Sequence, residues 1–328
     1  MIATLLSPLA FMGRHATRFL AFAVVLGFAI PPLSALVRPY LAALIVLPLV
    51  IALMRIDWVD LRAYARRWKL IALLCFWMII VSPVLAWLVL KDMGLTDGVL
   101  AGMVLMAAAP PIVSAAAIAL FLGLDGAVVI VSTVAAMWLT PFILPPMALY
   151  LLDLALEITL TTFMLRLAAL VTIAFGLAWI LRRVIGPEQL VSMRPHLDGA
   201  AVLAMTCFVV GVFDGVTGMA LEMPRHVLTT TILAFAFNIA LQVAGAALFW
   251  RLGPRIALSV GLMSGNCNMG LVLVTLSDRA DADTIMYFAV GQAPMYMLPV
   301  LLTPVYRYLV ARSDRKLPRT PGNKGNTT

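Results

Sequence analysis

Charged and metal-binding side chains are scarce in this sequence, and their scarcity limits what the protein can be. Only 12% of the 328 residues are charged, and there are three histidines and three cysteines. A soluble globular domain has about 25% charged residues. The cysteines all lie inside apolar runs, so no disulfide framework is expected. Neither a GxxxxGK[ST] phosphate-binding loop nor an HExxH metal motif occurs, which argues against a nucleotide-driven pump and a metalloenzyme.

What the sequence has in excess is apolar length. Hydrophobic residues make up 63% of the chain, and uncharged runs recur throughout it. About 20 apolar residues span a bilayer as a helix, whereas the strands of a membrane barrel would alternate polar and apolar residues. We therefore predict an all-α polytopic membrane protein. Ten transmembrane helices are expected, at residues 19–37, 39–54, 69–90, 98–122, 126–151, 160–181, 199–220, 227–250, 255–277 and 284–306.

No part of the sequence has the composition of a separate soluble domain. We predict one transmembrane domain over residues 1–311 and a disordered tail over 312–328, which is polar and contains Pro and Gly. The N-terminus lacks a basic start and a clear cleavage site, so it is not expected to be a signal peptide. The expected partners are the lipid bilayer and a small solute, and no cofactor is expected.

The positions of Lys and Arg predict the orientation. With ten spans, 18 of the 23 basic residues fall on the side that carries both termini, and only four fall on the opposite side. The positive-inside rule then places both termini in the cytoplasm and the protein in the cell membrane. Because the net charge of +8 resides in loops and tail, it does not indicate nucleic-acid binding.

Two of the predicted helices carry residues that weaken a helix at mid-depth. The fourth has Pro110 and Pro111 at its centre, and the ninth has the segment 264–270, SGNCNMG. Each is the fourth helix of a group of five, so the halves 19–151 and 160–306 would form inverted repeats. Paired, interrupted helices at matching positions point to a transporter's binding site. The alternative is that these are ordinary kinks and that the asparagines only join helices.

The two asparagines of the ninth helix suggest where it unwinds. Asn266 and Asn268 are two residues apart, so on a continuous helix they would point about 200° away from each other. Both can reach one site only if the helix opens at Gly265. From this pattern we predict that substrate contacts are made by Pro110, Pro111, Asn238, Ser264, Gly265, Asn266, Asn268 and Gln292.

Two segments resemble the bile acid:sodium symporter superfamily. Residues 107–141, AAAPPIVSAAAIALFLGLDGAVVIVSTVAAMWLTP, resemble its fourth and fifth helices, and residues 254–273, PRIALSVGLMSGNCNMGLVL, resemble its ninth. The resemblance implies a five-plus-five inverted repeat in which helices four and nine unwind and cross. It also implies a panel domain moving against a core domain, and organic-anion substrates usually coupled to sodium. By the same resemblance, Ser132 and Thr133 keep the hydroxyl of the fifth helix, Ser114 lies beside the serine position of the fourth, and all three are expected to contact the substrate.

The family's sodium ligands are replaced in this sequence. Their positions fall on Met78, Ala115, Ala116, Ser259 and Met263. Sodium prefers oxygen ligands, which Met and Ala side chains do not offer. We therefore expect no metal site and a loss of the usual sodium coupling.

These observations favour a secondary transporter of a small organic anion, working by alternating access, and not an enzyme. One alternative is an arsenite-type efflux permease of the same superfamily, which needs a cysteine beside an acidic residue; Cys267 has no acidic neighbour. The alternative from another class is an intramembrane enzyme, which would need His, Asp or Glu clustered at membrane depth. The substrate, the coupling ion, the direction of transport and the oligomeric state stay open.

Overall fold

The computed structural model describes residues 2–56, 66–152, 158–276 and 279–314. These residues form helices, and the sole β feature among them is an isolated antiparallel bridge between Pro111 and Cys267. The predicted all-α class is confirmed.

Among the described residues, seven helices are long and apolar enough to cross a membrane. They are Pro31–Met54 (α3, η1 and α4), Trp68–Leu90 (α6, η2 and α7), Gly126–Leu152 (α10), Leu160–Ile185 (α11), Arg194–Val212 (α13), Pro224–Leu248 (α15) and Ala282–Leu301 (α18). The protein is thus a multi-pass membrane protein. The fourth and ninth predicted spans are each divided into two shorter helices, which are not among these seven. The count of ten and the inverted repeat therefore remain predictions.

The first two spans meet at a different residue from the predicted one. Helix α2 (Ala16–Ala29) ends at Ala29, and the next helical stretch begins at Pro31. The prediction that residues 31–37 finish the first span is therefore wrong. Proline suits the first turn of a helix, where its missing N–H is not needed. The pair at Pro31 and Pro32 accordingly starts a helix that continues through η1 (Arg38–Tyr40) to Met54.

Two other spans also end earlier than predicted. Helix α13 stops at Val212, since Gly215 has a φ of +81°, and a separate helix α14 (Val216–Glu222) follows. In the intervening turn, Asp214 accepts a 2.8 Å hydrogen bond from Arg38. Helix α18 stops at Leu301, and α19 (Thr303–Asp314) follows it. Helix α19 extends three residues into the predicted tail; the rest of that tail lies outside the described residues.

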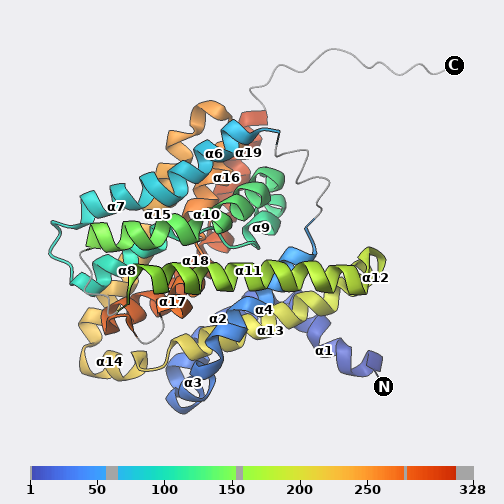
Figure 1. Cartoon of the computed structure of the whole chain (residues 1–328), viewed down its shortest axis with the longest axis horizontal. Helices are drawn as coiled ribbons and strands as arrows, with labels where there is room; N and C mark the ends of the chain where they lie inside the picture. Colours follow the sequence, from blue (N-terminus) through green and yellow to red (C-terminus); the bar gives the residue numbers. More distant parts are fainter. Residues whose placement is uncertain (1, 57–65, 153–157, 277–278, 315–328) are drawn as a thin grey trace.

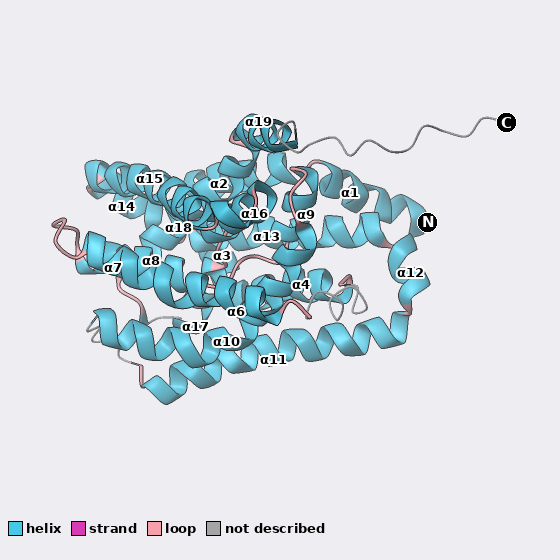
Figure 2. Cartoon of the chain, turned by 90° about the horizontal axis from the view of Figure 1, so that it is seen from above, coloured by secondary structure: helices cyan, strands magenta, loops and turns pink. Residues whose placement is uncertain are grey.

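The helices define two ends of the molecule. Helices α1 (Ile2–Arg14) and α12 (Pro187–Ser192) lie at one end, which we call the α12 end, in both views (Figure 1, Figure 2). Helices α7 (Ser82–Leu90) and α14 lie at the other, the α14 end. Helix α11 runs the length of the molecule between them. The α12 end carries the loop with Arg182, Arg183 and Arg194, which the sequence predicts to be cytoplasmic.

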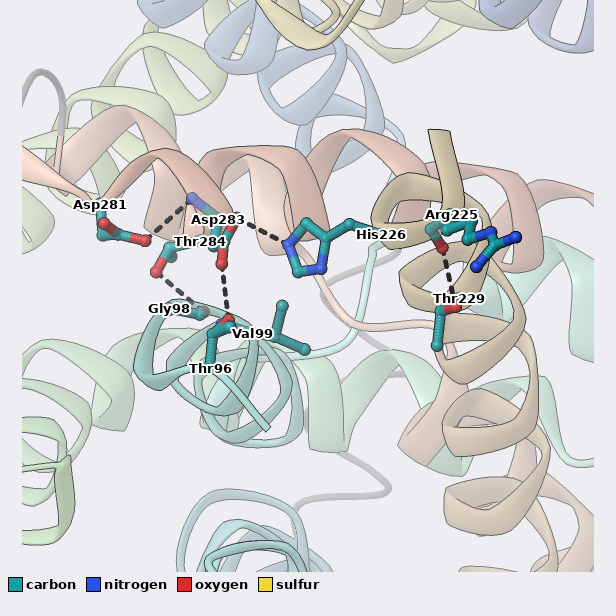
Figure 3. Close-up of polar contacts among 9 residues, drawn as sticks. All are labelled: Thr96, Gly98, Val99, Arg225, His226, Thr229, Asp281, Asp283 and Thr284. Atoms are coloured by element: carbon teal, nitrogen blue, oxygen red, sulfur yellow. Dashed lines mark hydrogen bonds and ion pairs between the residues drawn. The ribbon is translucent and has the colours of Figure 1, made fainter. Parts of the chain in front are cut away.

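A polar network joins the first turns of three helices at the α14 end (Figure 3). Asp283 of α18 pairs with His226 of α15 at 2.9 Å and accepts a 2.6 Å hydrogen bond from Thr96. Thr96 is the N-cap of α8 (Asp97–Ala108), and the Thr284 hydroxyl donates to the carbonyl of Gly98. These contacts fix the start of α8, the helix that leads to the predicted break.

Helices α15 and α16 (Pro254–Gly265) pack through glycine at their contact. A Cβ added to Gly261 would lie 2.5 Å from the carbonyl oxygen of Gln242 and 3.1 Å from the Cβ of Ala246. Small residues spaced four apart, such as Gly261 and Gly265, allow membrane helices to approach closely. The sequence GLMSG is therefore required for packing as well as for a break.

We expect Gly261→Ala to lower the thermal stability of the detergent-solubilised protein, because the added methyl group meets rigid backbone. Overpacking a tight contact costs about 1–3 kcal/mol. The matched control is Gly176→Ala on α11, where an added Cβ has no heavy atom within 4 Å. Melting temperatures measured side by side decide the matter: if the two variants melt together, the α15–α16 contact is not tight.

Candidate functional site

The two interrupted helices meet at their breaks. Helix α8 ends at Ala108 and α9 (Ala115–Phe121) begins seven residues later, while α16 ends at Gly265 and α17 (Met269–Leu276) begins at Met269. Two hydrogen bonds join the extended segments: Ile112 N donates to the Asn266 carbonyl at 2.9 Å, and Asn268 N donates to the Pro110 carbonyl at 2.7 Å. The predicted openings at Pro110–Pro111 and at Gly265 are confirmed, and they lie against each other.

This crossing satisfies backbone groups that the breaks would otherwise leave bare. A buried backbone group without a partner is costly, and at membrane depth it must be satisfied within the protein. The asparagine side chains help. The Nδ2 of Asn266 donates to the Leu262 carbonyl at 2.8 Å, at the end of α16, and the Oδ1 of Asn268 accepts from Leu271 N at 3.2 Å, at the start of α17. Each asparagine therefore caps one of the cut helices.

A cavity of about 850 Å³ extends from the crossing to the α12 end. Side chains of Ser114, Asn268 and Gln292, all predicted as substrate contacts, line it near the crossing. The other end is lined by Arg194 and by residues of α12. A cavity of this volume is in the range that takes a small organic molecule, and its lining is mostly apolar with a few polar groups, as is usual for such sites.

The other predicted contacts do not line this cavity. They are Pro110, Pro111, Ser132, Thr133, Asn238, Ser264, Gly265 and Asn266. All eight are buried. A direct role for them in substrate binding stays a prediction.

Three of these residues, Asn238, Ser264 and Gly265, belong to a buried network at the end of α16. The Nδ2 of Asn238 donates to the Gly265 carbonyl at 2.6 Å, and Asn238 Oδ1 accepts from Gln242, whose Oε1 accepts from the Tyr306 hydroxyl at 2.7 Å. The hydroxyl of Ser264 accepts from the indole N–H of Trp77 at 2.9 Å. These bonds hold the cut end of α16 in place behind the cavity.

Several buried polar atoms have no hydrogen-bond partner within the described part of the chain. They include the hydroxyls of Ser132 and Thr133, the Oδ1 of Asn266 and the Oε1 of Gln292. An unpaired buried polar atom costs about 1–3 kcal/mol. Of the four, only Gln292 borders the cavity, so its amide is the one best placed to gain from a polar ligand.

The positions of the family's sodium ligands are apolar in structure as well as in sequence. Met78, Ala115 and Met263 are buried in one hydrophobic cluster. Ala116 lines the cavity with a methyl group. Ser259 supplies a hydroxyl, but it already donates to the Arg255 carbonyl at 2.7 Å and accepts from Asp125 N at 3.2 Å. Within residues 2–56, 66–152, 158–276 and 279–314, no three His, Cys, Asp or Glu side chains gather as metal ligands.

Sequence reasoning missed several residues that line the cavity. Tyr296 lies one turn from Gln292 on α18, and its buried hydroxyl has no partner in the described chain. The spacing of four residues on one helix was a usable signal for this pair. Gly270 of α17 also lines the cavity, against Phe208 and Ile45.

Arginines at the α12 end of the cavity were interpreted only as topology signals. Arg55 forms an ion pair with Asp198, which joins the end of α4 (Leu41–Met54) to the start of α13. Arg182 donates to the carbonyls of Met54 and Ile56 at 2.7 and 2.6 Å, which caps the end of α4. This end of the cavity therefore carries three arginines and one carboxylate, with Arg194 as the third.

Comparison with protein-family models finds no match to this chain, and comparison with curated proteins finds none either.

Proposed function

We propose that the protein is a secondary transporter of the bile acid:sodium symporter type, moving a small organic anion by alternating access. The observation that carries the proposal is the cavity of about 850 Å³ that reaches from the crossing of two broken helices to one end of the molecule. Broken helices in a membrane are tolerated where they are buried or line a cavity, and transporters place substrate sites at such breaks. An ordinary helical bundle needs neither a crossing of two broken helices nor a cavity that leads to it.

The charges around the cavity favour an anion. At the α12 end the cavity is lined by three arginines, Arg55, Arg182 and Arg194, and by one carboxylate, Asp198. The net charge at this end, which we call the entrance, is therefore positive. At the crossing, Asn268 offers its Nδ2 as a donor, since its Oδ1 already accepts from Leu271 N, whereas the unpaired atom of Gln292 is its Oε1, which would accept from a donor group on the same ligand. Carboxylate or sulfonate groups would be attracted to the entrance, while an apolar body would suit the remaining lining.

The proposed orientation follows from the same residues. The α12 end carries the arginine-rich 182–194 loop, so the positive-inside rule makes it the cytoplasmic end. The cavity would then open to the cytoplasm, and the His226–Asp283 network would lie on the outer face. On this reading the protein resides in the cell membrane with both termini inside.

The experiment is a ligand screen followed by transport. Purified protein is tested for thermal stabilisation by a panel of organic carboxylates and sulfonates, each beside its neutral amide. We expect stabilisation by one or more anions and not by their amides, and uptake of the same anion into proteoliposomes. If no member of the panel binds or is transported, or if the amides bind equally well, the proposal fails.

Sodium dependence is a separate prediction. Because Met78, Ala115 and Met263 provide no oxygen ligand, uptake of the anion should be unchanged when choline replaces sodium at constant ionic strength. The control is a protein-free liposome preparation, which reports leakage of the anion. Saturable stimulation by sodium would contradict the prediction and would direct attention to the unpaired hydroxyls of Ser132 and Thr133.

A further inference from the structure

A second hollow lies on the outside of the helix bundle, and it shares only Val131 with the lining of the substrate cavity. It is a groove of about 520 Å³ between α6 (Trp68–Phe76) with η2 (Trp77–Val81) and helix α10. Every residue lining it is hydrophobic. Ala72 and Ala135 leave space between the two helices, and larger side chains border that space, including Phe76 and Leu139. Phe76 and Leu139 are themselves exposed, so the groove is open to the surroundings of the bundle.

The groove is as long as one leaflet of a membrane is deep. Its lining runs from Trp68 to Ile80 on one side and from Val131 to Ile143 on the other. Twelve residues of helix rise about 18 Å. The hydrocarbon core of a bilayer is about 30 Å thick, so one leaflet is about half of that. A single acyl chain of a phospholipid therefore matches the groove in length and in chemistry.

The charge at one end of the groove selects the headgroup. Trp68 is at this end, with the ammonium group of Lys69 5.7 Å from its ring centre, and Arg66 is exposed two residues before it. Tryptophan is enriched at the level of lipid headgroups, and Lys or Arg beside a membrane attracts anionic lipids. The basic residues and the apolar groove are thus arranged as the phosphate and the chain of one lipid would be.

We infer that this groove is a binding site for an anionic phospholipid, with one acyl chain between α6 and α10 and the headgroup beside Arg66 and Lys69. This inference does not depend on the proposed transport function, because of the residues lining the groove only Val131 also lines the substrate cavity, and neither Arg66 nor Lys69 does. It assigns a role to the exposed aromatic and aliphatic side chains that border the groove.

The test measures which lipid the protein retains. The full chain is reconstituted in nanodiscs of equal parts phosphatidylglycerol and phosphatidylcholine, extracted gently, and its bound lipids are weighed by native mass spectrometry. We expect wild-type protein to retain phosphatidylglycerol over phosphatidylcholine by about fivefold or more, since each basic residue near the surface favours an anionic lipid by roughly that factor.

Two kinds of variant test binding of the acyl chain separately from recognition of the headgroup. Ala135→Phe fills the groove and should abolish retention, while Ala169→Phe, on α11 and outside the groove, should not. The double variant Arg66→Glu with Lys69→Glu should still retain lipid but lose the preference for phosphatidylglycerol, and it decides the matter if Ala135→Phe does not fold. Equal retention of both lipids by the wild type, or equal behaviour of Ala135→Phe and Ala169→Phe, would overturn the inference.

Discussion

Replacing Asn268 by alanine is expected to weaken binding of the stabilising anion by about 5- to 140-fold. That range corresponds to the roughly 1–3 kcal/mol lost when a buried polar partner is left unmatched. Asn268 lines the cavity at the crossing, and its backbone is fixed by the hydrogen bond to Pro110. Its side chain is therefore held where a ligand would meet it. Affinity is measured by calorimetry with the anion identified in the thermal screen.

Two companion variants distinguish binding from folding. Asn268 also caps α17 by accepting from Leu271 N, and loss of such a cap costs about 0.5–2 kcal/mol of stability. Asn268→Asp keeps the acceptor at the helix start, where a negative charge is favourable, but removes the donor and repels an anion. It should not bind the anion, and burying its carboxylate is expected to lower the melting temperature as well. Asn266→Ala tests the prediction that Asn266 also contacts the substrate: early melting with near wild-type affinity would leave it only the helix cap, and a loss of affinity like that of Asn268→Ala would support the contact.

If Asn268→Ala and Asn268→Asp both bind as the wild type does, the cavity contact is absent and the asparagine only caps a helix. In the sequence the two asparagines cannot be told apart, because their spacing of two residues predicts the same substrate contact for both. The structure separates them, since one faces the cavity and the other turns back onto α16.

The parts of the fold that the sequence predicts correctly depend on local chemistry. Pro110 and Pro111 lack backbone donors, so a break there is expected whatever surrounds it. The start of α3 shows the limit of this reasoning. A proline pair either ends one helix or begins the next, and here residues 31–37 pack against α13 and continue into α4. The turn at Gly215 is similar, because a single glycine inside an apolar run does not say whether the helix continues.

The candidate site was predictable in part for the same reason. Asn268 and Gln292 are polar residues in apolar helices, so the sequence alone makes them candidates for a functional site. Tyr296 carries only the weaker signal of lying one turn from Gln292, because an aromatic residue on a membrane helix usually serves packing. Arg55 was assigned to topology, and its pairing with Asp198, 143 positions away, depends on how α4 meets α13. Contacts of that kind come from tertiary structure and leave no local pattern.

Gly270→Ala is expected to reduce transport by about 5- to 150-fold. Gly270 lies in the first turn of α17, and a Cβ there would be 2.6 Å from Cζ of Phe208 on α13 and 2.8 Å from Cδ1 of Ile45 on α4. Relieving such overpacking costs about 1–3 kcal/mol, and each 1.36 kcal/mol added to a rate-limiting barrier slows it tenfold. If the proposed alternating access moves the broken helix α17 against α4 and α13, this contact is crossed in every cycle.

The strongest form of this prediction is a rescue. The atoms that a methyl group on Gly270 would meet are the far ends of side chains, so shortening one of them should restore the space. Phe208→Leu combined with Gly270→Ala should recover most of the transport that Gly270→Ala loses, and the double-mutant cycle should show coupling well above 0.5 kcal/mol. Gly176→Ala controls for a glycine replaced on a helix with no close neighbour. Additive losses in the double variant would mean that Gly270 does not face Phe208 during transport, and that α17 moves against some other surface.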